Sequence, residues 1–141
     1  MIVADSSAII FYLTDDGPTG QWVRDRVRQE DSLAAPGLLD YEVMSALAGL
    51  SRGRRGGEPK LTKRQVEKGM ATFRLLPVDR HDTLPLWARI WELSANLSTY
   101  DAMYVALGEA LNVPLVTADR RIARAGAARC VVETINGSTA H

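Results

Sequence analysis

Residues 99–119 read TYDAMYVALGEALNVPLVTAD and decide how the rest of the chain is organised. The first part predicts a helix that is apolar on nearly all sides, with Glu109 as the only charge after Asp101, and such a helix belongs inside a protein. The second part predicts a short strand that stops at Asp119. Carboxylates at the ends of buried elements are costly unless something neutralises them, so other acids are expected to converge there.

Short apolar runs alternate with helical patterns along the whole chain. Strands are predicted at residues 2–4, 32–35, 75–78, 115–119 and 129–132, and helices at residues 8–13, 19–30, 38–52, 62–74, 83–96, 99–111 and 120–125. Strands joined by helical crossovers pair in parallel, and runs without alternation suit a sheet covered on both faces. We therefore expect a single domain over residues 1–141, a three-layer α/β/α sandwich with a central, roughly five-stranded parallel sheet.

Composition sets limits on partners and compartment. The 17 basic and 17 acidic residues leave a net charge of zero, so no overall field draws in a polyanion. One cysteine, Cys130, excludes an internal disulfide and a thiolate metal site. Asp5 interrupts the apolar N-terminus and no run is long enough to span a membrane, which indicates a cytoplasmic protein without a membrane partner.

Four acids are predicted to meet at one edge of the sheet. Asp5 and Asp119 follow strands, and ligands bind outside the carboxyl ends of parallel strands. Asp101 and Glu42 lie early in helices that begin at the same edge. Asp40 falls on the other side of the helix from Glu42, and its place in the first turn suits the helix dipole, so we interpret it as structural.

Clustered carboxylates repel one another unless a cation joins them. Oxygen ligands suit Mg²⁺ or Mn²⁺, and we expect Asp5, Asp101 and Asp119 to hold the metal. Such a cation lowers the pKa of a bound water and holds the oxygens of a phosphodiester in line for attack. Ser7 and Thr117 would orient these groups from behind, although Ser7 also fits a helix cap and Thr117 a plain strand position.

Four motifs together resemble the PIN domain, and more narrowly the VapC toxins of VapBC toxin–antitoxin pairs. They are IVADSSA around Asp5, EVMSAL from Glu42, YDAMYVAL around Asp101 and LVTADR around Asp119. The resemblance implies an Mg²⁺- or Mn²⁺-dependent endoribonuclease whose pocket comprises these four acids. It implies cleavage of tRNA or ribosomal RNA that stops translation. The chain departs from the family pattern at Gly108, where alanine is usual.

The resemblance also implies partners. A VapC-like chain forms a homodimer, and a cognate VapB-like antitoxin covers its pocket and binds promoter DNA on behalf of the complex. For the RNA itself, Arg120 and Arg121 next to Asp119, and Arg54 and Arg55 in a glycine-rich loop, are candidate phosphate contacts.

Two other functions remain open from the residues. A phospho-receiver domain is also a small α/β fold with acids at strand ends, and Asp79 would be its acceptor. A catalytically inert relic that only titrates an antitoxin is the second alternative, against which the complete set of acids argues.

Overall fold

The computed structural model of the chain describes residues 1–53, 57–135 and 138–140. The strands are β1 (Ile2–Ala4), β2 (Leu33–Pro36), β3 (Val78–His81), β4 (Leu115–Thr117), β5 (Val132–Thr134) and β6 (Ser138–Ala140). The helices are α1 (Ser6–Thr14), α2 (Pro18–Arg28), α3 (Leu38–Arg52), α4 (Lys63–Leu75), α5 (Trp87–Leu93), α6 (Thr99–Leu111) and α7 (Arg120–Ala125), with a 3₁₀ turn η1 (Leu84–Leu86) before α5.

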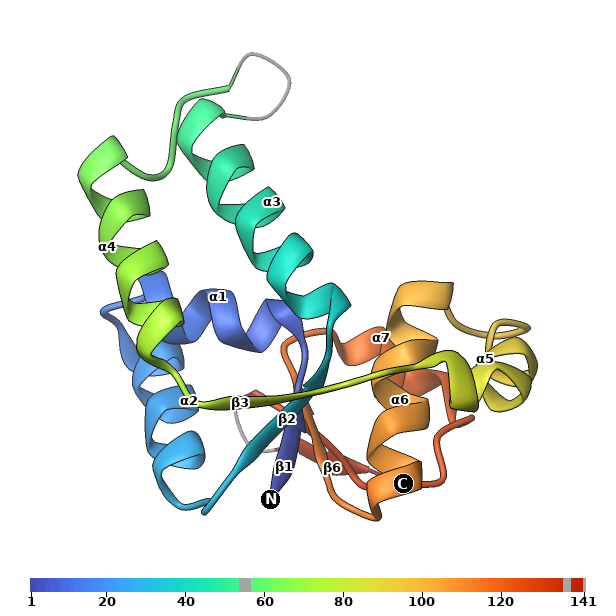
Figure 1. Ribbon diagram of the computed structural model, residues 1–141. Helices are drawn as coiled ribbons and strands as arrows, with labels where there is room; N and C mark the ends of the chain where they lie inside the picture. Colours follow the sequence, from blue (N-terminus) through green and yellow to red (C-terminus); the bar gives the residue numbers. More distant parts are fainter. Residues whose placement is uncertain (54–56, 136–137, 141) are drawn as a thin grey trace.

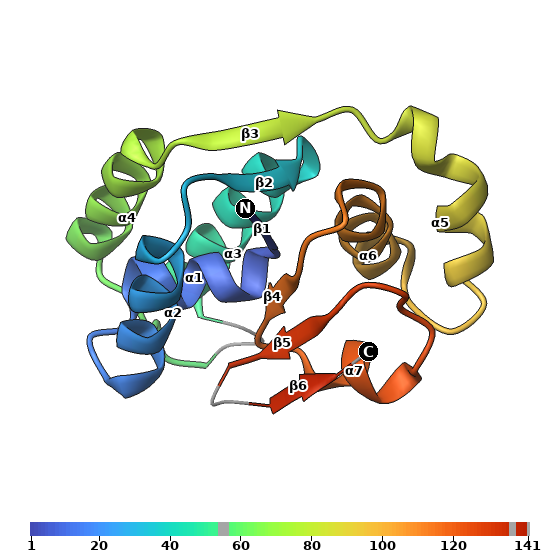
Figure 2. The same cartoon turned by 90° about the horizontal axis from the view of Figure 1, so that it is seen from below.

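The sheet has the order β3-β2-β1-β4-β5-β6. The first five strands in this order are parallel, as expected, and β6 adds an antiparallel edge that the sequence did not indicate. Helix α6, backed by α5, lies on one face, while α1 and α2 lie on the other (Figure 2). This arrangement confirms the α/β/α sandwich.

The central helix α6 is buried on nearly all sides, as its apolar sequence predicts. Its core residues include Tyr104, Val105 and Leu107, which pack with the strand residues of β1 and β4 in one continuous cluster. Gly108 is explained by close packing, since an added Cβ would lie 3.2 Å from Cys130 Sγ and 3.3 Å from the Val113 carbonyl oxygen. Burial raises the pKa of the Cys130 thiol to about 11, as expected of an unreactive core cysteine.

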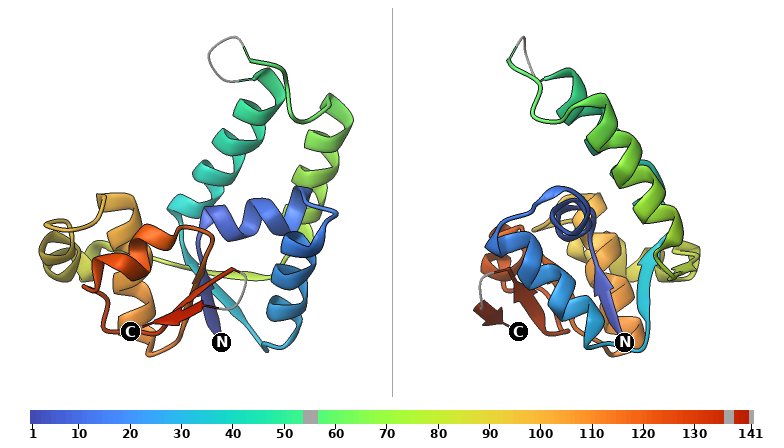
Figure 3. Two further views of the ribbon diagram at one scale, coloured as in Figure 1. Left: turned by 180° about the vertical axis from the view of Figure 1, so that it is seen from behind. Right: turned by 90° about the vertical axis from the view of Figure 1, so that its left-hand side faces the viewer.

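Helices α3 and α4 form a hairpin that stands away from the sheet (Figures 1 and 3). A capping box begins α4: Gln65 N donates to Thr62 Oγ1 at 3.2 Å, and Thr62 N donates to Gln65 Oε1 at 2.8 Å. No helix within the described residues is long and apolar enough to cross a bilayer.

Three sequence expectations are wrong in their bounds. The third strand is not at residues 75–78 but at β3, because α4 continues to Leu75 and β3 is a polar edge strand without an apolar run. The last parallel strand is β5 rather than residues 129–132. The helix expected at residues 83–96 shortens to α5, and Trp87 and Trp91 on it are exposed while Ile90 is buried.

Candidate active site

The starts of α1, α3, α6 and α7 gather at the carboxyl edge of the parallel strands (Figure 1). Each of these starts carries, or directly follows, one of the four predicted acids: Asp5, Glu42, Asp101 and Asp119. A helix that returns the chain between parallel strands begins at the edge where the strands end, which is why residues up to 114 positions apart meet there.

Asp5 is buried where β1 passes into α1. Its Oδ1 accepts hydrogen bonds from Ala8 N at 3.0 Å and from Ser7 Oγ at 2.6 Å. Its Oδ2 accepts from the hydroxyl of Thr117 on β4. Asp5 is therefore the N-cap of α1, and Ser7 does not cap this helix.

Ser7 and Thr117 connect the ends of β1 and β4. Besides donating to Asp5, Ser7 Oγ accepts from Ala118 N at 3.0 Å, and Thr117 Oγ1 accepts from Asp119 N at 2.9 Å. Each hydroxyl thus bonds an acid on one side and the backbone leading into α7 on the other. This network fixes the orientation of Asp5 and the course of the chain at Asp119.

Glu42 lies in the second turn of α3 and contacts α6. The buried hydroxyl of Tyr104 donates to Glu42 Oε1 at 2.5 Å. Because Oε1 is taken, Oε2 is the atom of this carboxylate that is left to act elsewhere. The contact ties two helices that are far apart in sequence and sets the direction of Glu42.

Asp101 and Asp119 sit at the starts of α6 and α7. Ser98 caps α6, because its hydroxyl accepts a hydrogen bond from Asp101 N at 3.1 Å. Asp119 caps α7 and is paired with Arg121, whose Nε lies 3.0 Å from Oδ1 and whose Nη2 lies 2.7 Å from Oδ2. Arg121 therefore engages both carboxylate oxygens of Asp119.

The acids repel one another, with Asp101 at the centre. Burial raises the pKa of Asp5 to about 6, and repulsion by Asp101 adds to the increase. Burial, then repulsion by Asp101, raises the pKa of Glu42, and burial and Asp119 raise the pKa of Asp101 itself. Only Asp119 differs, because the Arg121 guanidinium lowers its pKa. A positive charge is what this pocket lacks.

The chemistry of these oxygen donors fits Mg²⁺ or Mn²⁺, which prefer few carboxylates and retain water. In the described part of the chain, however, no three His, Cys, Asp or Glu side chains already lie close enough together to hold a metal ion. Asp5 is bonded to two hydroxyls, Glu42 to Tyr104 and Asp119 to Arg121. Cation binding would therefore need Asp119 to exchange Arg121 for the metal.

The candidate RNA contacts and Asp40 have different surroundings in the structure. Arg120 is exposed and makes no ion pair among the described residues, whereas Arg121 is occupied by Asp119. Arg54 and Arg55 lie outside the described residues. Asp40 is bound by Arg80 Nε at 2.9 Å to each oxygen, which agrees with its interpretation as structural.

Tyr104 is the site residue that sequence reasoning missed. The sequence presents Tyr104 only as part of an apolar helix. Its spacing from Asp101, three residues or nearly one helical turn, was the available signal, since residues at that spacing share a helix face. The Glu42 partner, however, lies 62 positions away and is visible only in the fold.

The chain is similar to known proteins in sequence and in fold. The sequence model described as the PIN domain matches residues 2–128. Ribonuclease VapC9 of Mycobacterium tuberculosis is 40% identical over 135 residues, which cover 96% of this chain and 98% of the relative.

Solved structures show the same fold. VapC20 of Mycobacterium tuberculosis, described as a sarcin–ricin loop cleaving toxin, superposes with a TM-score of 0.62 at 16% identity and covers 89% of this chain and 95% of its own. VapBC2 from Rickettsia felis, bound to a DNA fragment from its promoter, gives a TM-score of 0.64 at 14% identity and covers 96% and 100%.

Proposed function

The chain belongs to the PIN-domain family and, within it, to the VapC ribonucleases, and from this we propose that it is an Mg²⁺- or Mn²⁺-dependent endoribonuclease. The observation that carries the proposal is the convergence of Asp5, Glu42, Asp101 and Asp119, which lie at or near the starts of four helices, on one edge of the sheet. A phosphodiester is the substrate, and water is the second reactant.

Each acid has a distinct part in the proposed reaction. Asp5, Asp101 and Asp119 would hold the cation, which when bound neutralises the acids and the phosphate oxygens. Ser7 and Thr117 keep Asp5 in place through its two oxygens. With Tyr104 on Oε1, Glu42 accepts a proton from the attacking water at Oε2.

Phosphate binding would fall to the arginines beside Asp119. Arg120, which makes no ion pair among the described residues, could contact the backbone of RNA, and Arg121 could do so if a cation replaced it on Asp119. Such contacts make binding sensitive to salt, so RNA affinity that does not change between low and high salt would remove this assignment.

We propose tRNA or ribosomal RNA as the substrate class and arrest of translation in the cytoplasm as the result. The similar fold of VapC20, which is described as cleaving the sarcin–ricin loop, supports the ribosomal alternative. Mapping new 5′ ends in RNA from cells that express the chain distinguishes the two classes. Cleavage at one position in tRNA or in ribosomal RNA is expected.

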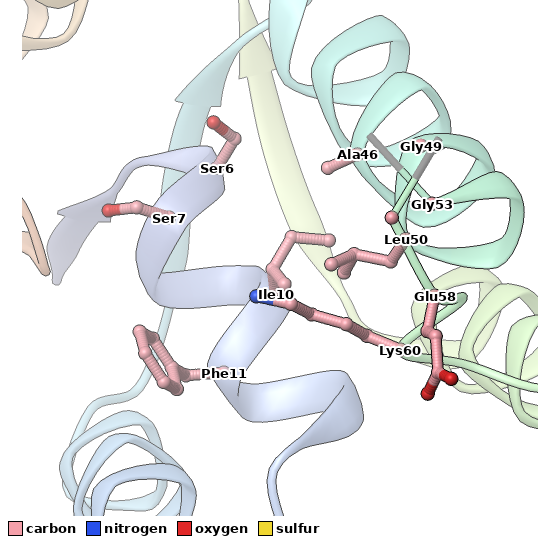
Figure 4. Close-up of a pocket in the computed structure, with 11 residues that line it drawn as sticks. Ser6, Ser7, Ile10, Phe11, Ala46, Gly49, Leu50, Gly53, Glu58 and Lys60 are labelled. Atoms are coloured by element: carbon pink, nitrogen blue, oxygen red, sulfur yellow. The ribbon is translucent and has the colours of Figure 1, made fainter. Parts of the chain in front are cut away.

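A groove beside the acids suits an antitoxin. It has a volume of about 800 Å³ and runs from Ser7 along α1 and α3. Ile10 and Leu50 point toward one another across it, and Lys60 reaches over it from the far side (Figure 4). Its apolar lining fits a helix of a VapB-like antitoxin. VapBC2 is described as bound to a DNA fragment from its promoter, and we propose that this chain would contact promoter DNA only through its antitoxin.

The chain is proposed to act as a homodimer and a toxin. Expression alone should arrest growth, and co-expression of the neighbouring antitoxin gene should restore it. Sedimentation of the purified chain tests the dimer separately. Growth unaffected by high expression of the intact chain would contradict the toxin role.

The test of the mechanism is Asp101→Ala. This variant should keep its fold, measured by circular dichroism, and lose Mg²⁺-dependent RNA cleavage. Asp40→Ala is the matched control, because Asp40 is also an acid in a first helical turn but pairs with Arg80 outside the pocket. Full cleavage by Asp101→Ala would overturn the mechanism.

The phospho-receiver alternative loses support, and the inert relic has a direct test. Asp79 is exposed within β3 rather than following a strand, so it has no phospho-acceptor position at the carboxyl edge. If the chain were an inert relic, neither the wild type nor Asp101→Ala would cleave RNA.

A further inference from the structure

Two exposed tyrosines directly precede two of the acids. Tyr41 precedes Glu42 on α3 and is 69% exposed, and Tyr100 precedes Asp101 on α6 and is 56% exposed. A single exposed aromatic ring needs no explanation. Two that adjoin acids of the same pocket, on different helices, form a repeated feature of the site.

The geometry of α6 turns Tyr100 toward α3. Tyr100 and Tyr104 are four residues apart and so lie on one face of the helix. Tyr104 from this face reaches Glu42 Oε1 at 2.5 Å, so Tyr100 stands one turn nearer the helix start on the side of α3. Tyr41 lies in the first turn of α3, one residue before Glu42. Tyr41 and Tyr100 are therefore exposed residues in the first turns of α3 and α6, where these helices begin beside the acids.

Charge alone is a poor source of RNA affinity here. The chain has a net charge of zero, and its pocket gathers four acids that repel phosphate. Arg121, the basic side chain closest to the acids, is engaged by Asp119. Stacking of bases on aromatic rings adds affinity without charge and serves single-stranded RNA of any sequence.

We propose that Tyr41 and Tyr100 form a platform on which unpaired RNA bases next to the scissile phosphate stack. This inference rests on the proposed ribonuclease function and names its substrate as unpaired RNA. A docking site for the antitoxin is the competing use of the same surface. Neither tyrosine lines the apolar groove between α1 and α3, which favours RNA as the occupant.

The test measures binding of a short fluorescein-labelled single-stranded RNA by anisotropy, with Ca²⁺ in place of Mg²⁺. Tyr41→Leu and Tyr100→Leu should each weaken binding roughly 5- to 150-fold, the range for loss of one stacked base. Tyr→Phe at either position should retain it, because the ring remains. The loss should be the same at low and high salt, since stacking is not ionic.

An RNA with one abasic nucleotide identifies the contact directly. At the stacked position it should weaken binding to the wild type by the same factor as the leucine variant, and weaken the leucine variant no further. Trp91→Leu is the control, because Trp91 is 81% exposed but lies on α5. It should leave affinity unchanged.

Three results would overturn the platform. They are wild-type affinity in both leucine variants, an equal loss in Trp91→Leu, or leucine variants that keep RNA and lose only the antitoxin. The ribonuclease function would survive all three, provided that the wild type cleaves RNA and Asp101→Ala does not. Cleavage by Asp101→Ala would instead overturn the function itself.

Discussion

Tyr104 shows how one buried hydroxyl can direct an acid on another helix. Tyr104→Phe should slow RNA cleavage at saturating Mg²⁺ about 10- to 100-fold, because partners that orient site carboxylates have effects of that size. Single-turnover rates give the measurement. Tyr12→Phe on α1 is the control, since the Tyr12 hydroxyl makes no hydrogen bond among the described residues. Equal rates in both variants would exclude an orienting role.

Arg121 occupies a carboxylate that the cation is proposed to need. Arg121→Gln should tighten Mn²⁺ binding by roughly two- to fivefold, the size expected when an exposed ion pair no longer competes. Calorimetric titration of the RNA-free protein measures this without reference to cleavage. Arg120→Gln should leave Mn²⁺ affinity as it is. If Arg121→Gln weakened Mn²⁺ binding, exchange between Arg121 and the metal would be wrong.

At the scale of elements, the junction of α1 and α2 depends on a close approach at Gly20. A Cβ there would lie 2.0 Å from the Asp15 carbonyl oxygen and 2.8 Å from that of Phe11. Gly20→Ala should therefore destabilise the fold by about 3 kcal/mol or more, measured by urea unfolding.

Gly49 within α3 is the matched control. It has nothing within 4 Å of an added Cβ, so Gly49→Ala should stabilise the fold by up to about 1 kcal/mol through helix propensity. Equal effects of the two substitutions would show that the α1–α2 junction adjusts.

For the whole molecule, the acidic pocket makes metal-free stability depend on pH. The pKa of Asp5 rises from 3.8 to about 6 on folding, so the folded protein holds this proton more tightly than the unfolded chain. The resulting stability is complete below about pH 4 and is lost as the pH rises through about 6. The loss from Asp5 is on the order of 3 kcal/mol as an upper bound.

Thermal unfolding in EDTA should therefore show that the wild type loses stability between pH 4 and 7. The stability of Asp5→Asn should depend less on pH over the same range. Mg²⁺ at neutral pH should restore stability to the wild type, because the cation neutralises the acids in place of the proton. Parallel pH profiles of the two proteins would contradict the burial of a charged Asp5.

The sequence by itself determined the order of elements and the positions of Asp5, Asp101 and Asp119 at their ends. These follow from local rules, since apolar runs, helical periods and caps are properties of neighbouring residues. Local rules did not locate strand β3, because this edge strand lacks an apolar run. They also did not predict the exposure of Trp87 and Trp91, because an apolar residue need not be buried.

Only the tertiary structure decided which groups meet across the chain. Tyr104 reaches Glu42 because the fold brings the first turns of α3 and α6 to one edge of the sheet, and Thr117 reaches Asp5 because β4 pairs with β1. The exposure of Tyr41 and Tyr100 likewise depends on what packs around their helices. Contacts between residues 62 or 112 positions apart leave no local pattern, since the packing of distant elements selects them.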